Sequence, residues 1–561
     1  MQRRQGSQNF VGSFVAAAIA LTGVACTGSV GQDSANQDTE GPGAGGGSGP
    51  AVSACGGTPK AAVGQWRRLT TTQYANTVRD LLGQVPSVSS FLTDSRTGPF
   101  KTNSSSPVQE NEVGNYLESA ATVATKAVTN MGGLLGGCNP SVTGGEDKCS
   151  AQFIKDFGAR AFRRPLLPDE ETALTVVYKL GKEESFATGI RMVIQAALQS
   201  PSFLYLVETG RSDPSGLRKL DGYEVASRLS YTLTGSMPSA ELFAAAREGK
   251  LDSSSGVRTA AEKLLSSPNF VSQAAAFNAE LIGIEDLADT SLVAKAPKFA
   301  NAFDVPMRAA MIEESRKFVE YVMNKGSGTV EELLSANYVF PTGPLAKVYG
   351  PNAKPDGDGR AVITDGTRKG LLTLAANLAV HPKQYSPSAA VNRGHLVRRE
   401  FLCETVPPPS EAVDFTPPPG AEKMTAQELL REHQKNPTCF ACHRLMDSIG
   451  FAMESYDALG AHRTKDDAGK SIDPSGEVVD LAGDGRFKNA GELAEILSRS
   501  PEVRTCMSTQ WFRFALGRDP DEADACTQEQ VKKAFTEGKG DIKQAILSLV
   551  ASDSFRLNGG Q

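Results

Sequence analysis

The 561-residue chain lacks several features that mark common protein classes. Its formal net charge is −6 and it has no long basic block, which argues against a nucleic-acid partner. Its five histidines include no H-E-x-x-H motif, and no nucleophile elbow accompanies them, so zinc-protease and serine-hydrolase chemistry lack support. Strand signals are sparse and helical periodicity is frequent. These patterns predict a mainly α protein of several helical domains in series. The composition, 40% hydrophobic and 22% charged, is ordinary for a globular protein of this length.

Local signals place several helix starts. Thr70-x-x-Gln73 is a capping-box pattern, and Asp221 with Glu224 is another. Pro168 precedes three acidic residues, which favour the positive end of a helix dipole. Arg228 lies among the apolar positions of the helix that Asp221 begins. We therefore expect Arg228 to be partly buried and paired with an acid.

A short pattern recurs four times: an apolar helical run ends at serine, and proline or aspartate follows, then usually phenylalanine. The pattern predicts a helix end followed by an apolar residue that folds back on the core. An old duplication of a helical unit is the alternative interpretation. The four segments are 198–203, 265–270, 497–503 and 550–555.

The first residues resemble an export signal. Arg3 and Arg4 precede the apolar run 14–25, which is long enough for a signal-peptide core and too short to span a bilayer as a mature anchor. The run ends at Cys26 after small residues, as in a bacterial lipoprotein cleavage box. We expect a signal peptide over 1–25 and lipidation of Cys26. Lipidation predicts a protein tethered to the outer membrane, facing the periplasm or the cell surface.

Residues 26–63 are almost wholly small or polar, and such a composition predicts a disordered tether. Composition shifts after it divide the chain into a first helical domain over 64–149, a second over 150–210 and a third over 218–345. A connecting module over 355–420 ends in two proline runs, which predict extended spacers that present the last segment, 421–558, as a separate body.

One pentapeptide, Cys439-Phe-Ala-Cys442-His443, carries the most specific chemistry of the chain. In the C-x-x-C-H spacing, two thiols on one helical turn can form thioethers with porphyrin vinyl groups, and the adjacent imidazole can bind the iron. A thioredoxin-type dithiol should follow a strand, and a zinc site needs a second Cys/His pair nearby; neither accompanies this motif. The sequence therefore predicts one covalently attached haem c with His443 as the proximal iron ligand.

The sixth iron ligand stays open between two residues. Met446 is on the same helical face as His443 and cannot bind from the opposite side, and Met453 reads as a core residue. Met507 is far enough along the chain to reach the distal face, and aromatic residues surround it in the sequence. His433, six residues before the motif, is the other candidate. An open position would permit small-ligand or peroxide chemistry.

The chain has nine cysteines, a number that is consistent with an exported, disulfide-bonded protein. Once Cys26 and the two haem cysteines are assigned, six remain, and an even remainder suggests disulfides. Cys138 and Cys149 bracket a glycine-rich loop, and Cys506 and Cys526 flank a helix, so each pair is predicted to form a local bridge. Cys55 with Cys403 is the leftover pairing, and a free buried thiol at Cys403 is its alternative.

Several stretches together resemble a known architecture. The chain is similar to large exported proteins of planctomycetes and myxobacteria, which consist of successive domains of unknown function and end in a cytochrome-c-like module. The resemblance implies haem attachment and domain order, and it implies no reaction. Ser448 departs from the proline usual in this family. The matching stretches are 67–74, 78–83, 160–166, 226–231, 237–238, 392–394 and 439–451, with Glu454, Tyr456, Asp457 and Gly460.

Three functional hypotheses follow from these observations. The first is a lipid-anchored electron-transfer protein that exchanges single electrons with a redox partner protein, such as a dehydrogenase, and is not itself the catalyst. The second is a haem enzyme with an open distal site, although a single C-x-x-C-H motif argues against the two-haem peroxidase plan. The third is a scaffold that binds envelope or extracellular polysaccharide and in which haem is structural.

Overall fold

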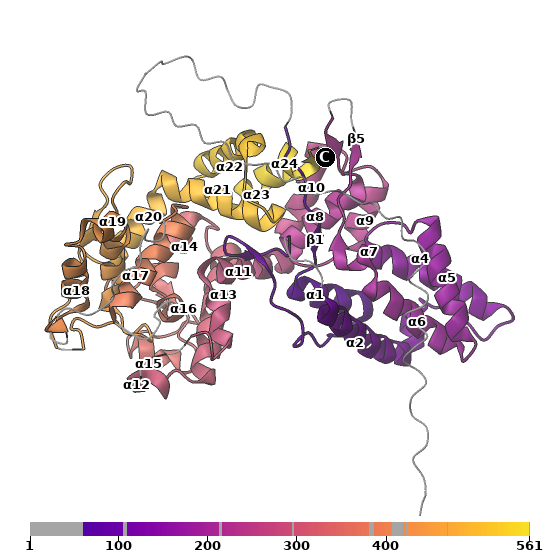
Figure 1. Ribbon diagram of the computed structural model, residues 1–561, viewed down its shortest axis with the longest axis horizontal. Coiled ribbons are helices and arrows are strands. Elements are labelled where there is room, and N and C mark those ends of the chain that lie inside the picture. Colours follow the sequence, from indigo (N-terminus) through magenta and orange to yellow (C-terminus); the bar gives the residue numbers. More distant parts are fainter. Residues whose placement is uncertain are drawn as a thin grey trace, which may run out of the picture. The chain divides into compact units, whose positions relative to one another are not determined.

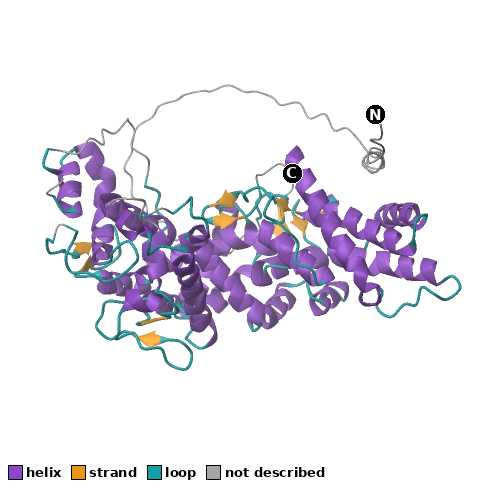
Figure 2. Cartoon of the chain, turned by 90° about the horizontal axis from the view of Figure 1, so that it is seen from below, coloured by secondary structure: helices purple, strands orange, loops and turns teal. Residues whose placement is uncertain are grey.

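A computed structural model describes residues 60–104, 109–212, 216–293, 295, 297–380, 386–406, 419–421, 424–467 and 469–559. The chain divides into two units, 1–53 and 54–561, and every described residue lies in the second. The signal peptide, Cys26, Cys55 and the first proline run fall outside the described residues. The described chain is mainly helical, as predicted, with short two-residue strands (Figures 1 and 2). None of its helices has the length and apolar character needed to cross a membrane.

The first part of the unit runs from residue 60 to residue 212. Strand β1 pairs antiparallel with β4, and β2 forms a hairpin with β3. The elements are β1 (Arg67–Arg68), α1 (Thr71–Leu82), β2 (Arg96–Thr97), β3 (Phe100–Lys101), α2 (Glu110–Ala127), η1 (Val128–Asn130), α3 (Met131–Leu134), α4 (Gly145–Phe162), α5 (Pro168–Lys182), α6 (Phe186–Gln199), α7 (Pro201–Leu204), β4 (Tyr205–Leu206) and β5 (Arg211–Ser212).

The middle part runs from residue 216 to residue 380. Strand β6 is the centre of a three-stranded sheet between β5 and β11, and β7 pairs with β8. The elements are β6 (Arg218–Lys219), α8 (Gly222–Thr234), α9 (Ala240–Arg247), α10 (Ser254–Leu265), α11 (Pro268–Ile282), η2 (Ile284–Ala288), α12 (Pro297–Ala300), α13 (Val305–Asn324), α14 (Val330–Ser335), β7 (Tyr338–Val339), α15 (Leu345–Tyr349), β8 (Ala361–Val362), η3 (Leu371–Thr373) and α16 (Ala375–Val380).

The last part begins at residue 386 and contains the C-x-x-C-H motif. Strands β9 and β10 form a small hairpin. The elements are α17 (Ser386–Leu396), the π-helical turn η4 (Val397–Phe401), α18 (Ala426–His433), α19 (Pro437–Ala452), η6 (Met453–Ser455), β9 (Gly476–Glu477), β10 (Arg486–Phe487), α20 (Ala490–Arg499), α21 (Pro501–Leu516), η7 (Glu522–Asp524), α22 (Ala525–Glu537), α23 (Ile542–Ala551), α24 (Asp553–Arg556) and β11 (Leu557–Asn558).

Local capping explains where many helices begin. At the start of α1, the Thr70 hydroxyl accepts from the Gln73 amide at 3.2 Å, and the Gln73 side chain accepts from the Thr70 amide at 3.1 Å. Asp221 and Glu224 make the same reciprocal pair at α8, and Pro168 occupies the first turn of α5. Each bond satisfies an amide that the helix itself leaves unpaired. These three predicted helix starts are confirmed.

The recurrent serine pattern marks a sharp corner between two helices. In all four segments the first helix ends and a second begins directly after a serine N-cap, at Pro201, Pro268, Pro501 or Asp553. The apolar residue that follows is fully buried each time, as predicted. The second helix could not be predicted, because a helix end and a corner between two helices share the same serine and proline signals. The buried residues are Phe203, Phe270, Val503 and Phe555.

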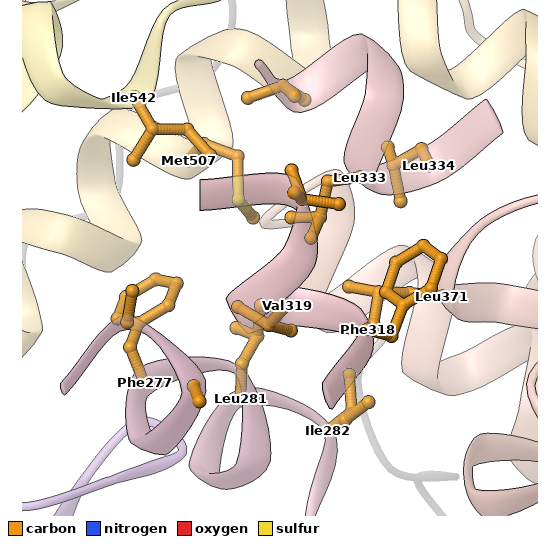
Figure 3. Packing of buried hydrophobic residues seen from close by; sticks show 14 of the residues in the cluster. Phe277, Leu281, Ile282, Phe318, Val319, Leu333, Leu334, Leu371, Met507 and Ile542 are labelled. Atoms are coloured by element: carbon orange, nitrogen blue, oxygen red, sulfur yellow. The ribbon is translucent and has the colours of Figure 1, made fainter. Parts of the chain in front are cut away.

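Two hydrophobic cores organise the described unit. One is built almost wholly from residues 69–206, together with Tyr231. The other contains Phe100 and continues from residue 220 to residue 555 (Figure 3). The expectation that 421–558 forms a separate body is therefore wrong: helices of this segment bury their apolar faces against α11, α13 and α14 in one continuous core.

Arg228 joins distant parts of the chain. Its side chain is 4% exposed and forms an ion pair with Glu208 at 2.5 Å. It also donates to the Phe555 carbonyl at 2.6 Å, near the C-terminal strand β11. The predicted burial and pairing of Arg228 are thus confirmed, and the charge is compensated on both sides.

Candidate functional site

The C-x-x-C-H motif occupies the first two turns of α19. The Asn436 side chain caps this helix by accepting from the Thr438 amide at 2.9 Å, and Pro437 fills the first helical position, where no amide hydrogen is needed. The spacing of Cys439, Cys442 and His443 at i, i+3 and i+4 then places all three side chains on one side of the helix. Both cysteines are half-buried thiols.

A buried carboxylate fixes the orientation of His443. Its Nδ1 lies 3.0 Å from each carboxylate oxygen of Asp447, one helical turn further along. Asp447 is 1% exposed and His443 is 17% exposed at the side chain. The Gln434 side-chain amide donates to Asp447 at 2.8 Å and holds the carboxylate from the other side. The proton is therefore placed on Nδ1, and Nε2 points away from the carboxylate.

His433, at the end of α18, lies directly beside this pair. The ring centroids of His433 and His443 are 4.7 Å apart, with an angle of 74° between the ring planes. Burial lowers the pKa of His433, the neighbouring His443 lowers it further, and Asp447 opposes both effects. His433 is thus biased toward the neutral form, which can accept or donate a hydrogen bond through its ring nitrogens.

Helix α17 packs closely against α19, the helix that carries the motif. A Cβ atom on Gly394 would lie 1.9 Å from the Met446 carbonyl oxygen, and one on Gly450 would lie 1.9 Å from the Ala390 carbonyl oxygen. Only glycine allows the two backbones to approach so closely. A small apolar cluster of Ala390, Leu430 and Phe451 joins α17, α18 and α19.

Two buried arginines hold the chain around α19. The Arg398 side chain is fully buried and donates to the Leu445 carbonyl at 2.7 Å and to the Val479 carbonyl at 2.7 Å. Arg393 donates to the Met453 carbonyl at 2.6 Å, just past the helix end. These bonds satisfy carbonyl groups and fix α19 to α17 and to the loop that follows.

The other candidate ligands lie in different surroundings. Met507 is 2% exposed and belongs to the main core with Leu333 and Ile542 (Figure 3). Met453 is also a core residue, as predicted. His462 lies beside Tyr456, and His381 falls outside the described residues. Of the two proposed distal ligands, only His433 is placed next to His443.

The disulfides differ in part from the predicted pairing. Cys138 and Cys149 are bridged, as their spacing predicts. Cys506, however, is bonded to Cys403 and not to Cys526, so both the predicted local bridge and the leftover pairing of Cys403 with Cys55 are wrong. Cys526 is engaged in a disulfide of its own. Proximity along the chain misled the prediction, because α21 packs against η4 and brings Cys506 to Cys403.

Sequence reasoning missed two residues of the site. Asp447 follows His443 by one helical turn, and this i, i+4 spacing was the available signal. Gln434 reaches Asp447 from a different helix, and no local pattern indicates that contact. Over the described part of the chain, no group of three or more His, Cys, Asp or Glu side chains is arranged to hold a metal ion.

Fold and site together define a mainly helical multidomain protein with a C-x-x-C-H helix in its C-terminal half. Five protein families match it in succession, which supports a multidomain family whose function is unknown. A search of curated proteins and a search of solved structures found no match. The matches are to proteins of unknown function DUF1587 (67–129), DUF1595 (149–208), DUF1592 (220–350), DUF1588 (368–466) and DUF1585 (484–555).

Two of these families bear directly on the site. DUF1588 and DUF1585 are associated with cytochrome-c-like domains. The DUF1588 segment contains α17, α18 and α19, and therefore the whole cluster of Cys439, Cys442, His443 and Asp447. The DUF1585 segment contains α20 to α24, which pack on the shared core.

Proposed function

We propose that the protein is an exported c-type haem protein that works in electron transfer. The observation that supports this most directly is the alignment of Cys439, Cys442 and His443 on one side of α19, with the Nδ1 of His443 held by Asp447. Two thioether-forming thiols and an imidazole with its Nε2 directed away from the carboxylate are the groups that a covalent haem requires.

The residues present fit this group. Cys439 and Cys442 would hold the porphyrin covalently, and His443 would bind the iron from the proximal side. When bound, the haem would supply reversible one-electron chemistry. The two thiols are half-buried, His443 is partly exposed and Phe440 is 47% exposed, so a haem attached here would lie at the protein surface. A redox partner protein could approach this edge directly.

Asp447 has a defined role in this proposal. A negative carboxylate on the Nδ1 hydrogen makes the imidazole a stronger electron donor at Nε2. A stronger donor stabilises the oxidised iron relative to the reduced iron and lowers the reduction potential. Gln434 keeps the carboxylate in place, so the ring cannot rotate away from the ligand position.

A second candidate function is a haem enzyme with an open distal position. His443 would hold the iron, and a second protein ligand would have to come from His433 or Met507. The rings of His433 and His443 already contact each other, with centroids 4.7 Å apart, and Met507 lies in the core. These two observations are the reason for keeping the enzyme as a second candidate.

Covalent haem in the full-length chain is the first test. The full chain is used because 421–558 shares its core with the preceding helices. Expressed in a periplasm with haem-maturation machinery, the protein should keep haem on a denaturing gel. Cys439→Ser with Cys442→Ser should abolish the covalent colour, whereas Cys138→Ser with Cys149→Ser, a matched pair far from the motif, should retain it. A colourless wild-type protein would contradict the proposal.

The spectrum of the same protein separates the two functions. A low-spin, six-coordinate haem supports electron transfer, and a band near 695 nm, a wavelength typical of methionine ligation, would assign Met507. A low-spin form without that band, lost on His433→Ala, would assign His433. A high-spin, five-coordinate form with turnover of peroxide would support the enzyme instead.

Export and lipid anchoring at Cys26 complete the proposal. The supporting feature is the apolar run 14–25 that ends at this cysteine. In a bacterial host the protein should fractionate with the outer membrane and incorporate labelled palmitate. Cys26→Ser should release it into the periplasm, and a protein that stays in the cytoplasm would refute export.

A further inference from the structure

A polar cleft whose lining does not include the C-x-x-C-H motif has the features of a ligand site. Its volume is about 550 Å³, within the range of small-molecule pockets. Its walls come from the β2–β3 hairpin, the end of α11, the turn η4 and helix α21. These four elements belong to four different matched families, and ligand sites often lie where domains meet.

Hydrogen bonds, an ion pair and a disulfide hold these walls together. The Lys101 amide of the hairpin donates to the Glu280 carboxylate at 2.8 Å, and the Lys101 ammonium donates to Glu285 at 2.7 Å. The Thr97 hydroxyl donates to the Gly517 carbonyl just beyond α21 at 3.0 Å. A disulfide between Cys403 and Cys506 joins the loop after η4 to α21. The cleft is therefore a built feature of the fold.

Both arginines and carboxyl groups line the cleft. The charged residues in its lining include Arg96, Glu280, Asp286, Arg399, Glu400 and Arg513. Glu404 also lines it, but its carboxylate is already paired with Arg398 at 2.7 Å.

Arg399 is the side chain best placed to bind an anion. Within the described residues its guanidinium donates only its Nε group, to Glu400, so both terminal nitrogens remain for a bidentate contact. Arg513 donates to Asp519 at 2.6 Å and to Gln510 at 3.2 Å and retains one terminal nitrogen. The planar fork of arginine matches a carboxylate group.

Two irregular backbone features lie at the same wall. The turn η4 is π-helical, a geometry that is frequent at functional sites. Cys403 adopts a φ of 55°, a left-handed conformation that is uncommon for residues other than glycine. Both features belong to the segment that places Arg399 and Glu400 in the cleft.

We propose that this cleft binds a small hydroxylated monocarboxylate, either a free hydroxy acid or a uronic-acid unit of a polymer. The carboxylate is held by Arg399 and Arg513, and the hydroxyl groups face Glu280 and Asp286. A dianion such as phosphate fits less well, because four carboxyl groups share the lining with three arginines.

Because carboxyl groups line the cleft, the affinity for an anion should depend on pH. Burial raises the pKa of Glu280 to about 7, and it also raises the pKa of Glu400. The charged groups that face Glu280 are Lys101 and Arg96 on the hairpin and Glu285 on η2. Below pH 7 Glu280 is mostly neutral and the anion meets less repulsion. Above pH 7 Glu280 is ionised, so the affinity should fall as the pH rises.

Calorimetry with the full-length chain tests this inference, with D-galacturonate and tri-galacturonate as probes. Wild-type protein should bind at pH 6, and Arg399→Gln should lose about tenfold or more in affinity. Arg486→Gln, an exposed arginine on the distant strand β10, should bind like wild type. Equal affinity for both probes would assign a free acid, and tighter binding of the trimer would assign a polymer.

A second variant keeps the test decisive. Glu280→Gln should lose the drop in affinity between pH 6 and pH 8, because the glutamine carries no charge at either pH. If Arg399→Gln fails to fold by circular dichroism, Arg513→Gln takes its place. Absence of binding by wild type to either probe, or full affinity in both arginine variants, would overturn the proposal.

Discussion

At the scale of single residues, Asp447 has the most direct influence on the proposed chemistry. It is buried, it contacts His443, and Gln434 fixes its orientation. Cys439, Cys442 and His443 could be identified from the sequence because their chemistry depends on a fixed local spacing. Asp447 lies on the same helix as these three residues. His433 and Gln434 lie at the end of α18, and no local sequence pattern reveals that α18 packs against α19.

Asp447→Asn is predicted to raise the reduction potential of the haem-loaded protein. Asparagine can still accept from Nδ1, but it lacks the negative charge that strengthens the iron ligand. A rise of about 60 mV, equal to a tenfold shift in a one-electron couple, is the expected order. Potentiometric titration of the full chain measures it. An unchanged potential in a variant with full haem content would show that Asp447 has no electronic role.

Glu314, on α13, is predicted to make the protein less stable as the pH rises from about 4.5 to 7. Its carboxyl group is 0% exposed, and burial raises its pKa to about 7. The folded state therefore keeps a proton that the unfolded state releases, so the free energy of unfolding falls over this range, by up to about 3 kcal/mol.

Glu314→Gln should remove that pH dependence. Urea titrations at pH 5 and pH 7.5 would compare the two proteins, and the difference between wild type and variant isolates this group from other acids. A variant that loses as much stability between the two pH values as wild type would contradict the assignment.

At the scale of secondary-structure elements, helix starts were predictable and helix neighbours were not. Thr70, Asp221 and Pro168 act within one turn of themselves, so their effect can be read from four consecutive residues. Which helix packs on which depends on contacts between residues far apart in sequence. The approach of α17 to α19 through Gly394 and Gly450 is such a contact, and the sequence marks it only by two glycines.

Gly450→Ala is predicted to destabilise the protein by about 1–3 kcal/mol, because the added methyl group meets the Ala390 carbonyl oxygen and forces α17 and α19 apart. Thermal unfolding followed by circular dichroism measures the effect. Gly114→Ala, on the exposed face of α2 with open space around it, is the matched control and should be neutral or slightly stabilising. Equal behaviour of the two variants would show that the helices adjust freely.

At the scale of the whole molecule, the described helices of the C-terminal half depend on those before them. The same core contains Leu333 of α14, Met507 of α21 and Ile542 of α23 (Figure 3). Proline runs and composition suggested an independent last domain, because sequence composition reports where a chain is polar and not which apolar surfaces meet.

A fragment of residues 421–558 is therefore predicted not to fold cooperatively. Removing α11, α13 and α14 would expose the apolar faces of α20, α21 and α23 to water. Denaturant titration should show no sharp transition, and a dye that binds exposed apolar surface should fluoresce with the fragment but not with the full chain. A sharp transition with no dye binding would restore the separate body that the sequence suggested.

The bridge between Cys403 and Cys506 encloses the motif cysteines in its covalent loop. In the proposed export from the N-terminus, the thiols that would emerge next after Cys403 are Cys439 and Cys442, and Cys506 would arrive later. Oxidation of Cys403 with either of these two thiols would consume a cysteine that the proposed haem attachment needs. Under the proposed function, correct maturation therefore requires that haem ligation precede oxidation, or that an isomerase reverse the early mispairing. The yield of active protein should then depend on the timing of these two enzyme systems.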